Sequence, residues 1–118
     1  MQFIPLLLTQ CTFFIGSHLY LDHNQFTGLL PAYFGQIGNG RLKQLYLNDN
    51  DLEGKVPDSW DPKDQLTNMA VHNNKLTVRV PPEVCELSVF ELGNMVEFRT
   101  DCDICTCDFL CEMCNETD

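Results

Sequence analysis

Basic side chains are scarce in this sequence: its 118 residues include seven Lys and Arg against seventeen Asp and Glu, a formal net charge of -10. A surface of that sign repels phosphate backbones and anionic lipid headgroups. We therefore expect no nucleic-acid partner. The acidic excess is concentrated in residues 83–118, which hold ten Asp and Glu and a single basic residue, Arg99.

Catalytic signatures are also missing. The sequence holds no GxSxG, HExxH or P-loop motif and no glycine-rich dinucleotide turn. An acid/base site built from Asp22, His23 and Asp49 is the alternative that the few histidines offer. Because no nucleophile with a partner base accompanies these residues, we expect a protein that is not an enzyme and needs no cofactor.

Long apolar runs are absent as well, since crossing a bilayer as a helix takes about 20 such residues. Residues 1–16 are apolar enough to suggest a secretory signal, but Pro5 interrupts them and no Lys or Arg lies near Met1. A shift of 26 residues aligns residues 4–8 with residues 30–34. We therefore favour a truncated leading repeat, from a longer protein, over a signal peptide, and we expect no membrane span in this chain.

Internal repeats are the main positive signal. Residues 19–24 (LYLDHN) align with residues 45–50 (LYLNDN) at an offset of 26, and with residues 69–74 (MAVHNN) after a further 24. A fourth start, at residues 92–98, places Met95 at the position of Met69 and lacks the asparagine.

The repeated positions have physical roles. The alternation of apolar and polar residues in Leu45-Tyr46-Leu47 is typical of a half-buried strand, so successive copies predict a parallel sheet. The apolar side chains must face inward, because one coil alone cannot bury them. In register, the side-chain amides can bind the backbone where each strand ends. We therefore predict a structural asparagine ladder: Asn24, Asn50 and Asn74.

Residues 42–57 (LKQLYLNDNDLEGKVP) resemble the consensus LxxLxLxxNxLxGxIPxxLxxL of plant-type leucine-rich repeats, and the resemblance extends over about residues 19–98. It implies an α/β solenoid: a right-handed coil with a short parallel β-sheet on the concave face and few or no regular helices. Similar proteins include receptor-like and secreted plant proteins and diatom proteins with a C-terminal Cys-rich tail. They share recognition of ligands by the concave face.

This resemblance suggests a division of the chain into six segments. We expect a partial leading repeat (1–18), three repeats (19–44, 45–68 and 69–94), a terminal strand (95–101) and an acidic Cys-rich tail (102–118).

Cysteine is concentrated in the tail, which holds five of the seven cysteines. Two CxxC pairs suggest zinc, but they are separated by only five residues, whereas zinc ribbons usually leave about 15 to 20. We favour three disulfides, which would staple the tail to the last coil. The candidates are Cys85, Cys102, Cys105, Cys107, Cys111 and Cys114, with Cys11 left over and the pairing open.

The disulfide hypothesis and a glycosylation sequon at Asn115 favour an extracellular or cell-surface location. We expect a non-catalytic interaction module, a piece of a receptor-like or secreted protein that binds a protein, peptide or glycan through its concave face. The alternative is a structural or adhesive component of a matrix or wall, with a cross-linked acidic tail.

The predicted binding residues are the outward side chains of the strands and of the positions just after them. We predict Tyr20, Asp22, His23, Tyr46, Asn48, Asp49 and His72. The Tyr20 and Tyr46 pair is favoured, because exposed tyrosines offer a large contact area and a hydroxyl. In the fourth coil, the expected alignment puts Val96 beside Ala70.

Overall fold

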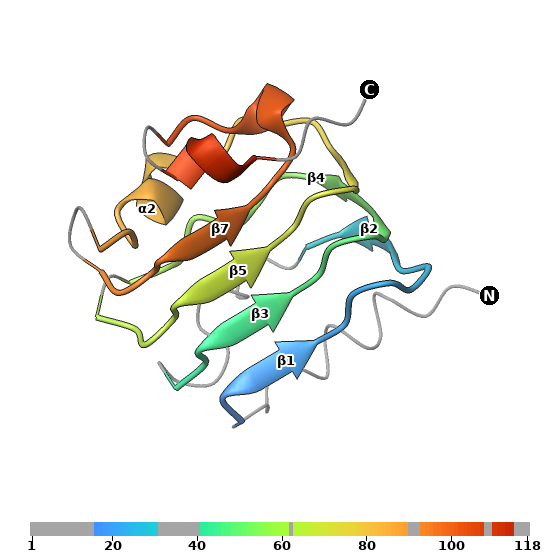
Figure 1. Ribbon diagram of the computed structural model, residues 1–118. Helices are drawn as coiled ribbons and strands as arrows, with labels where there is room; N and C mark the ends of the chain where they lie inside the picture. Colours follow the sequence, from blue (N-terminus) through green and yellow to red (C-terminus); the bar gives the residue numbers. More distant parts are fainter. Residues whose placement is uncertain (1–15, 31–40, 62, 90–92, 108–109, 115–118) are drawn as a thin grey trace.

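The computed structural model describes residues 16–30, 41–61, 63–89, 93–107 and 110–114, and two parallel sheets form its framework (Figure 1). The four-stranded sheet has the order β1 (His18–Tyr20), β3 (Gln44–Tyr46), β5 (Asn68–Ala70) and β7 (Glu97–Arg99). The three-stranded sheet has the order β2 (Thr27–Leu29), β4 (Asp51–Gly54) and β6 (Lys75–Leu76). The second sheet was not predicted from the sequence.

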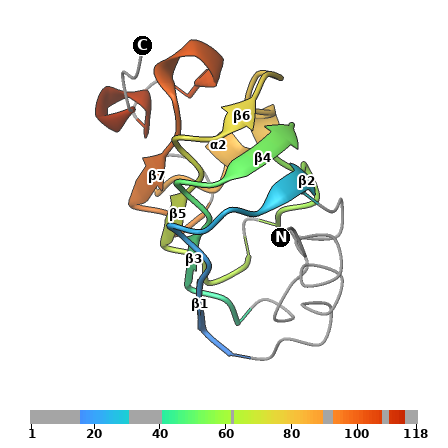
Figure 2. The same ribbon diagram turned by 90° about the vertical axis from the view of Figure 1, so that its right-hand side faces the viewer.

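The strands belong to four stacked coils. The first three coils contribute β1 and β2, β3 and β4, and β5 and β6, and the fourth contributes β7. Figure 2 shows the three-stranded sheet beside the four-stranded one, with the coils in the same order. The described helices are short: α2 (Pro82–Cys85) and the 3₁₀ helices η3 (Cys102–Ile104) and η4 (Leu110–Met113). Parallel strands with so little helix confirm the predicted solenoid architecture.

The register of the first three coils follows the repeat, but the predicted alignment of the fourth coil is wrong. Leu45 pairs with Met69 as expected, and Met69 then pairs with Phe98, not Met95. The outward neighbour of Ala70 is therefore Arg99, not Val96. The chain between β5 and β7 is longer than the repeat predicts, because it includes α2 and the parallel bridge between Ser88 and Met95. Met95 is fully buried, so its apolar character gave a false match.

The core lies on the inward side of the strands. Leu45, Leu47 and Leu52 of the second coil have no exposed surface, and Phe98 of the fourth coil is equally enclosed. The period of two explains this, since neighbouring side chains of a strand point to opposite sides. The first coil is less buried: Leu19, Leu21 and Phe26 are only partly covered. Burial is therefore most complete in the coils that have a described coil on each side.

Asn50 joins its own coil to the preceding one. Its side-chain nitrogen donates hydrogen bonds to the carbonyls of Leu47 and Asn48, and to that of Leu21 in the first coil, at 3.0 to 3.3 Å. Its side-chain oxygen accepts a hydrogen bond from the backbone N–H of Phe26 at 3.1 Å. A buried amide with all these partners satisfies backbone groups that the tight turn leaves without ladder partners.

The same arrangement recurs at Asn74, which bonds Leu47 and Leu52 of the second coil as well as its own turn. Asn24 donates to Leu21 and Asp22 within its own coil. In all three turns the residue before the asparagine has a positive φ of 56° to 61°. Few non-glycine residues adopt this conformation, and Asn, Asp and His do so most readily.

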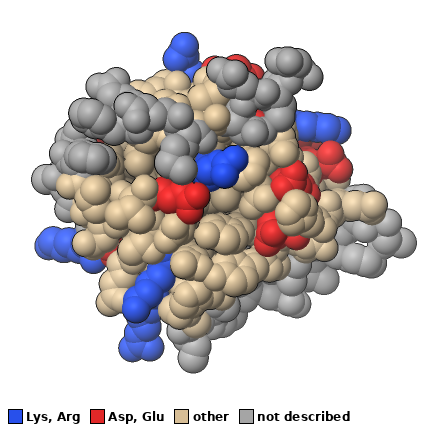
Figure 3. Space-filling view, viewed as in Figure 1, with Lys and Arg blue, Asp and Glu red and all other residues tan. Residues whose placement is uncertain are grey.

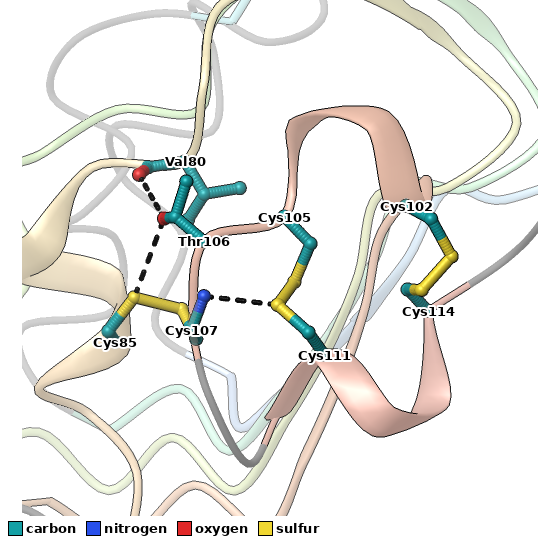
Figure 4. The surroundings of a disulfide bond; sticks show 8 residues. All are labelled: Val80, Cys85, Cys102, Cys105, Thr106, Cys107, Cys111 and Cys114. Carbon is teal, nitrogen blue, oxygen red and sulfur yellow. Dashed lines mark hydrogen bonds between the residues drawn. A yellow bond between two sulfur atoms is a disulfide. The ribbon is translucent and has the colours of Figure 1, made fainter.

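The tail forms a cap over the last coil, here defined as residues 101–107 and 110–114. Three disulfides confirm the predicted cross-linking and settle its pairing: Cys85–Cys107, Cys102–Cys114 and Cys105–Cys111 (Figure 4). This result is against the zinc alternative. Cys11 and Asn115 lie outside the described residues, as does most of the predicted leading repeat.

Of the three described disulfides, Cys85–Cys107 is the one that links the cap to the repeats, through α2. Backbone contacts reinforce it: the N–H of Val80 donates to the carbonyl of Ile104 at 2.9 Å, and the Thr106 hydroxyl donates to the carbonyl of Val80 at 2.8 Å. Ile104 and Leu110 are buried in the common core. The cap therefore covers apolar surface that a fifth coil would otherwise bury.

We expect Asn50→Ala to lower the free energy of unfolding by about 2 kcal/mol, because it leaves buried backbone groups of two coils without partners. Urea unfolding followed by circular dichroism measures this. Asn24→Ala is the control, since the Asn24 side chain is exposed and, among the described residues, bonds only its own coil. An equal loss in both variants would contradict the role of Asn50 between coils.

Candidate ligand-binding face

The outward surface of the four-stranded sheet, here called the strand face, carries rows of side chains that cross the coils. The pairing of the strands sets the central row: Tyr20, Tyr46, Ala70 and Arg99. Neighbouring strands of a sheet lie about 4.8 Å apart, so these side chains are close neighbours. Three large residues and one methyl group therefore share a single row.

The two tyrosines of this row stack on each other. Their ring centroids are 5.0 Å apart and their planes are inclined by 23°. The hydroxyl of Tyr20 hydrogen-bonds the side chain of Gln44, and Tyr20 remains 52% exposed. Burial raises the pKa of Tyr46, and the negative charge of Glu97 raises this pKa further. The pair forms an ordered aromatic surface at one side of the strand face.

A hollow of about 280 Å³ opens beside Tyr46. Its floor is Ala70, whose methyl group stands between the larger Tyr46 and Arg99 in the adjacent coils. Glu97 also lines it, and accepts a hydrogen bond from the Asn68 amide at 2.8 Å. Figure 3 shows acidic and basic side chains interspersed over this face, among mostly uncharged residues.

Two polar atoms at the hollow have no hydrogen-bond partner. They are Nδ1 of His72 and Nε of Arg99, and both are buried. Burial lowers the pKa of His72, and the positive charge of Arg99 lowers it further, so the ring is neutral at pH 7. Buried polar groups are nearly always satisfied in folded proteins. Neither atom has appreciable solvent-accessible surface, so both lie behind the lining of the hollow.

A polar rim follows the strands at the turns. Asp49 accepts hydrogen bonds from the amides of Asn73 and Asn48, at 2.8 and 2.6 Å. Burial alone would raise the pKa of Asp49, but these hydrogen bonds outweigh it and hold the pKa below its usual value. His23 lies between two carboxylates, 3.4 Å from that of Asp49 and 3.5 Å from that of Asp22. These contacts order the turns of successive coils.

The structure brings together part of the predicted set. Asp22, Tyr46, Asn48 and His72 line the hollow. Tyr20 lies against Tyr46, while the side chains of His23 and Asp49 belong to the rim.

Three other lining residues were not predicted: Ala70, Glu97 and Arg99. Glu97 was missed because the fourth coil was placed three residues out of register, and the same error put Arg99 in the row of Asn73 instead of that of Ala70. Ala70 belongs to no motif. The available signal was a small residue in a row that otherwise carries large ones.

The neutral state of His72 predicts a dependence of stability on pH. As the pH falls through 6.5, the usual pKa of histidine, His72 is protonated in the unfolded chain but stays neutral in the folded protein. The free energy of unfolding therefore falls. Urea unfolding at pH 7.5 and 5.5 should show a smaller loss for His72→Gln than for the wild type. His18→Gln, at an exposed histidine, is the control, and identical losses for the wild type and His72→Gln would contradict this account.

Comparison with known proteins agrees with this geometry. The family model described as Leucine Rich Repeat matches residues 17–37 and 41–62. A 61-residue segment is 34% identical to Receptor-like protein 39 of Arabidopsis thaliana, covering 51% of this chain and 7% of that protein. None of the helices in the described ranges has the length and apolar character of a membrane span. With the stacked coils and their repeated asparagines, these matches show that the chain contains leucine-rich repeats and is similar to plant-type leucine-rich-repeat proteins.

Proposed function

We propose that this chain is a non-catalytic interaction module that binds a protein, peptide or glycan through the strand face, as part of a receptor-like or secreted protein. The observation that carries this proposal is the hollow over Ala70, where an aromatic ring, an imidazole, an amide and charged groups from four coils line one opening on the strand face. Such a concave site with a few convergent polar groups is typical of ligand binding.

The surroundings of the hollow favour binding over catalysis. Its described lining contains no serine, threonine, cysteine or lysine to act as a nucleophile. Asp22, His23 and Asp49 lie close together, but His23 is highly exposed at the rim. Water screens charges at such a position, and the contacts of Asp49 serve the turns. We infer a recognition surface with no chemistry of its own.

An extracellular location is part of the proposal. Three disulfides link six cysteines within a short segment of the chain. Such bonds persist in oxidising compartments and are rare in the cytosol. The relative named above is called a receptor-like protein, which agrees with a cell-surface role.

The cap argues against the structural alternative, in which the tail is the functional part. Ile104, Cys107 and Leu110 are buried against the last coil. The Cys85–Cys107 bridge holds this segment in place. Stabilising the end of the array accounts for the cysteines of the tail, which leaves the strand face as the candidate for recognition.

Filling the hollow should abolish binding. We expect Ala70→Trp to place an indole in the hollow, whereas Val78→Trp, at an exposed site after β6, leaves it open. The probes are a pool of N-acetylated, C-amidated hexapeptides and a pool of cell-wall oligosaccharides, added to ¹⁵N-labelled protein. One pool should shift the amide signals of β3, β5 and β7 in the wild type and Val78→Trp, but not in Ala70→Trp. Shifts confined to the cap in all three proteins would contradict the proposal.

A further inference from the structure

We propose that the strand face selects an extended peptide of mixed charge, which crosses the coils with an acidic side chain at Arg99 and a basic side chain at Asp22. This inference rests on the proposed function and names its ligand. It follows from the positions of the charged and polar groups that line the hollow.

The hollow has the carboxylate of Asp22 at one end and the guanidinium of Arg99 at the other, where the neighbouring Glu97 carboxylate already accepts a hydrogen bond from Asn68. Asp22 belongs to the first coil and Arg99 to the fourth, with Tyr46 and Ala70 on the coils between them. Three steps between coils, at about 4.8 Å each, separate the two ends by roughly 14 Å. A ligand lying across the coils therefore meets a carboxylate at one end and a guanidinium at the other.

An extended peptide matches this separation. With a rise of about 3.4 Å per residue, roughly four residues span the distance, and residues four apart point to the same side of an extended chain. One acidic and one basic side chain at that spacing can both face the hollow. The residues between them pass over Tyr46 and the floor at Ala70, which favours short uncharged side chains there.

The polar groups between the ends suit a peptide backbone. The Asn48 amide nitrogen donates to Asp49 at 2.6 Å, and the amide oxygen of the same side chain is an acceptor. Every residue of an extended peptide other than proline presents one N–H and one carbonyl that require partners. Asn48 can therefore bind the ligand's main chain while the charged ends select its side chains.

Ligands of a single charge fit less well. A peptide with two acidic side chains places the second one against Asp22, and a peptide with two basic side chains places one against Arg99. Neutral sugars use neither charged end. The volume of about 280 Å³ is at the small end for a site that encloses a whole small molecule. It suits a few side chains of a longer ligand.

The test uses capped pentapeptides, N-acetylated and C-amidated so that their termini carry no charge. One set joins an aspartate and a lysine by three serines, in both orders, because a chain can lie across the face in either direction. The others carry two aspartates or two lysines. Titration into ¹⁵N-labelled protein should show at least one mixed-charge peptide binding about tenfold more tightly than the two-aspartate and two-lysine peptides, with shifts at Ala70, His72 and Arg99.

A charge swap identifies the end that Arg99 contacts. Arg99→Glu should weaken the mixed-charge peptide about tenfold and strengthen the two-lysine peptide by a similar factor. Arg79→Glu is the matched control, since Arg79 is exposed and lies outside the hollow, and it should change neither affinity. Unchanged circular dichroism and thermal unfolding establish that each variant is folded.

The outcomes separate this inference from the proposed function. Equal binding of the two-aspartate peptide, or shifts of the strand face by neutral cell-wall oligosaccharides alone, would overturn the mixed-charge ligand and leave the strand face as the binding surface. If none of the probes shifts the strand face, both proposals fail.

Discussion

The structure depends on one constraint: a single coil cannot bury its own inward side chains. Leu45, Leu47 and Leu52 are completely enclosed because a coil lies on each side of them, whereas Leu19 and Leu21 of the first coil are only partly covered. Asn50 adds directional contacts to this stacking, since one side chain serves backbone groups of two coils. The fold is thus stable only as an array.

The same constraint explains the cap and the binding face. The last coil has an apolar side that needs cover, and the disulfide-linked tail supplies it through Ile104 and Leu110. The hollow belongs to no single coil either, because its floor and walls come from all four. A change in the packing between coils therefore changes the ligand site, even when no lining residue is altered.

Much of the fold was predictable from the sequence, because its causes are local and periodic. The recurring alternation around Leu45 and Met69 indicates strands, and their equal spacing indicates a parallel sheet. The fourth coil escaped prediction, because both Met95 and Phe98 are buried and only the path of the chain through α2 decides which of them pairs with Met69. The strands of the second sheet contain glycine, aspartate, glutamate and lysine, residues that are depleted in strands and so give no strand signal.

The site was harder to predict than the fold, because the hollow exists where Ala70 has a small side chain between larger neighbours. Ala70 contributes a floor only because Tyr46 and Arg99 flank it, and this depends on a register that the repeat did not supply. Tyr46 and His72 were accessible to prediction, since they occupy outward positions of well-aligned repeats.

Native-state hydrogen exchange tests most directly whether the coils unfold together as one cooperative unit. The amides of Leu21, Leu47 and Val71 each donate to a carbonyl of the next coil at 2.8 Å. Leu47 and Val71 lie in coils enclosed on both sides, and should exchange only at the free energy of global unfolding measured with urea. The amide of Leu21, in the less buried first coil, should exchange with a lower free energy of opening. Exchange of Leu47 and Val71 at separate, lower free energies would show that each coil opens alone, which contradicts a surface maintained by the array.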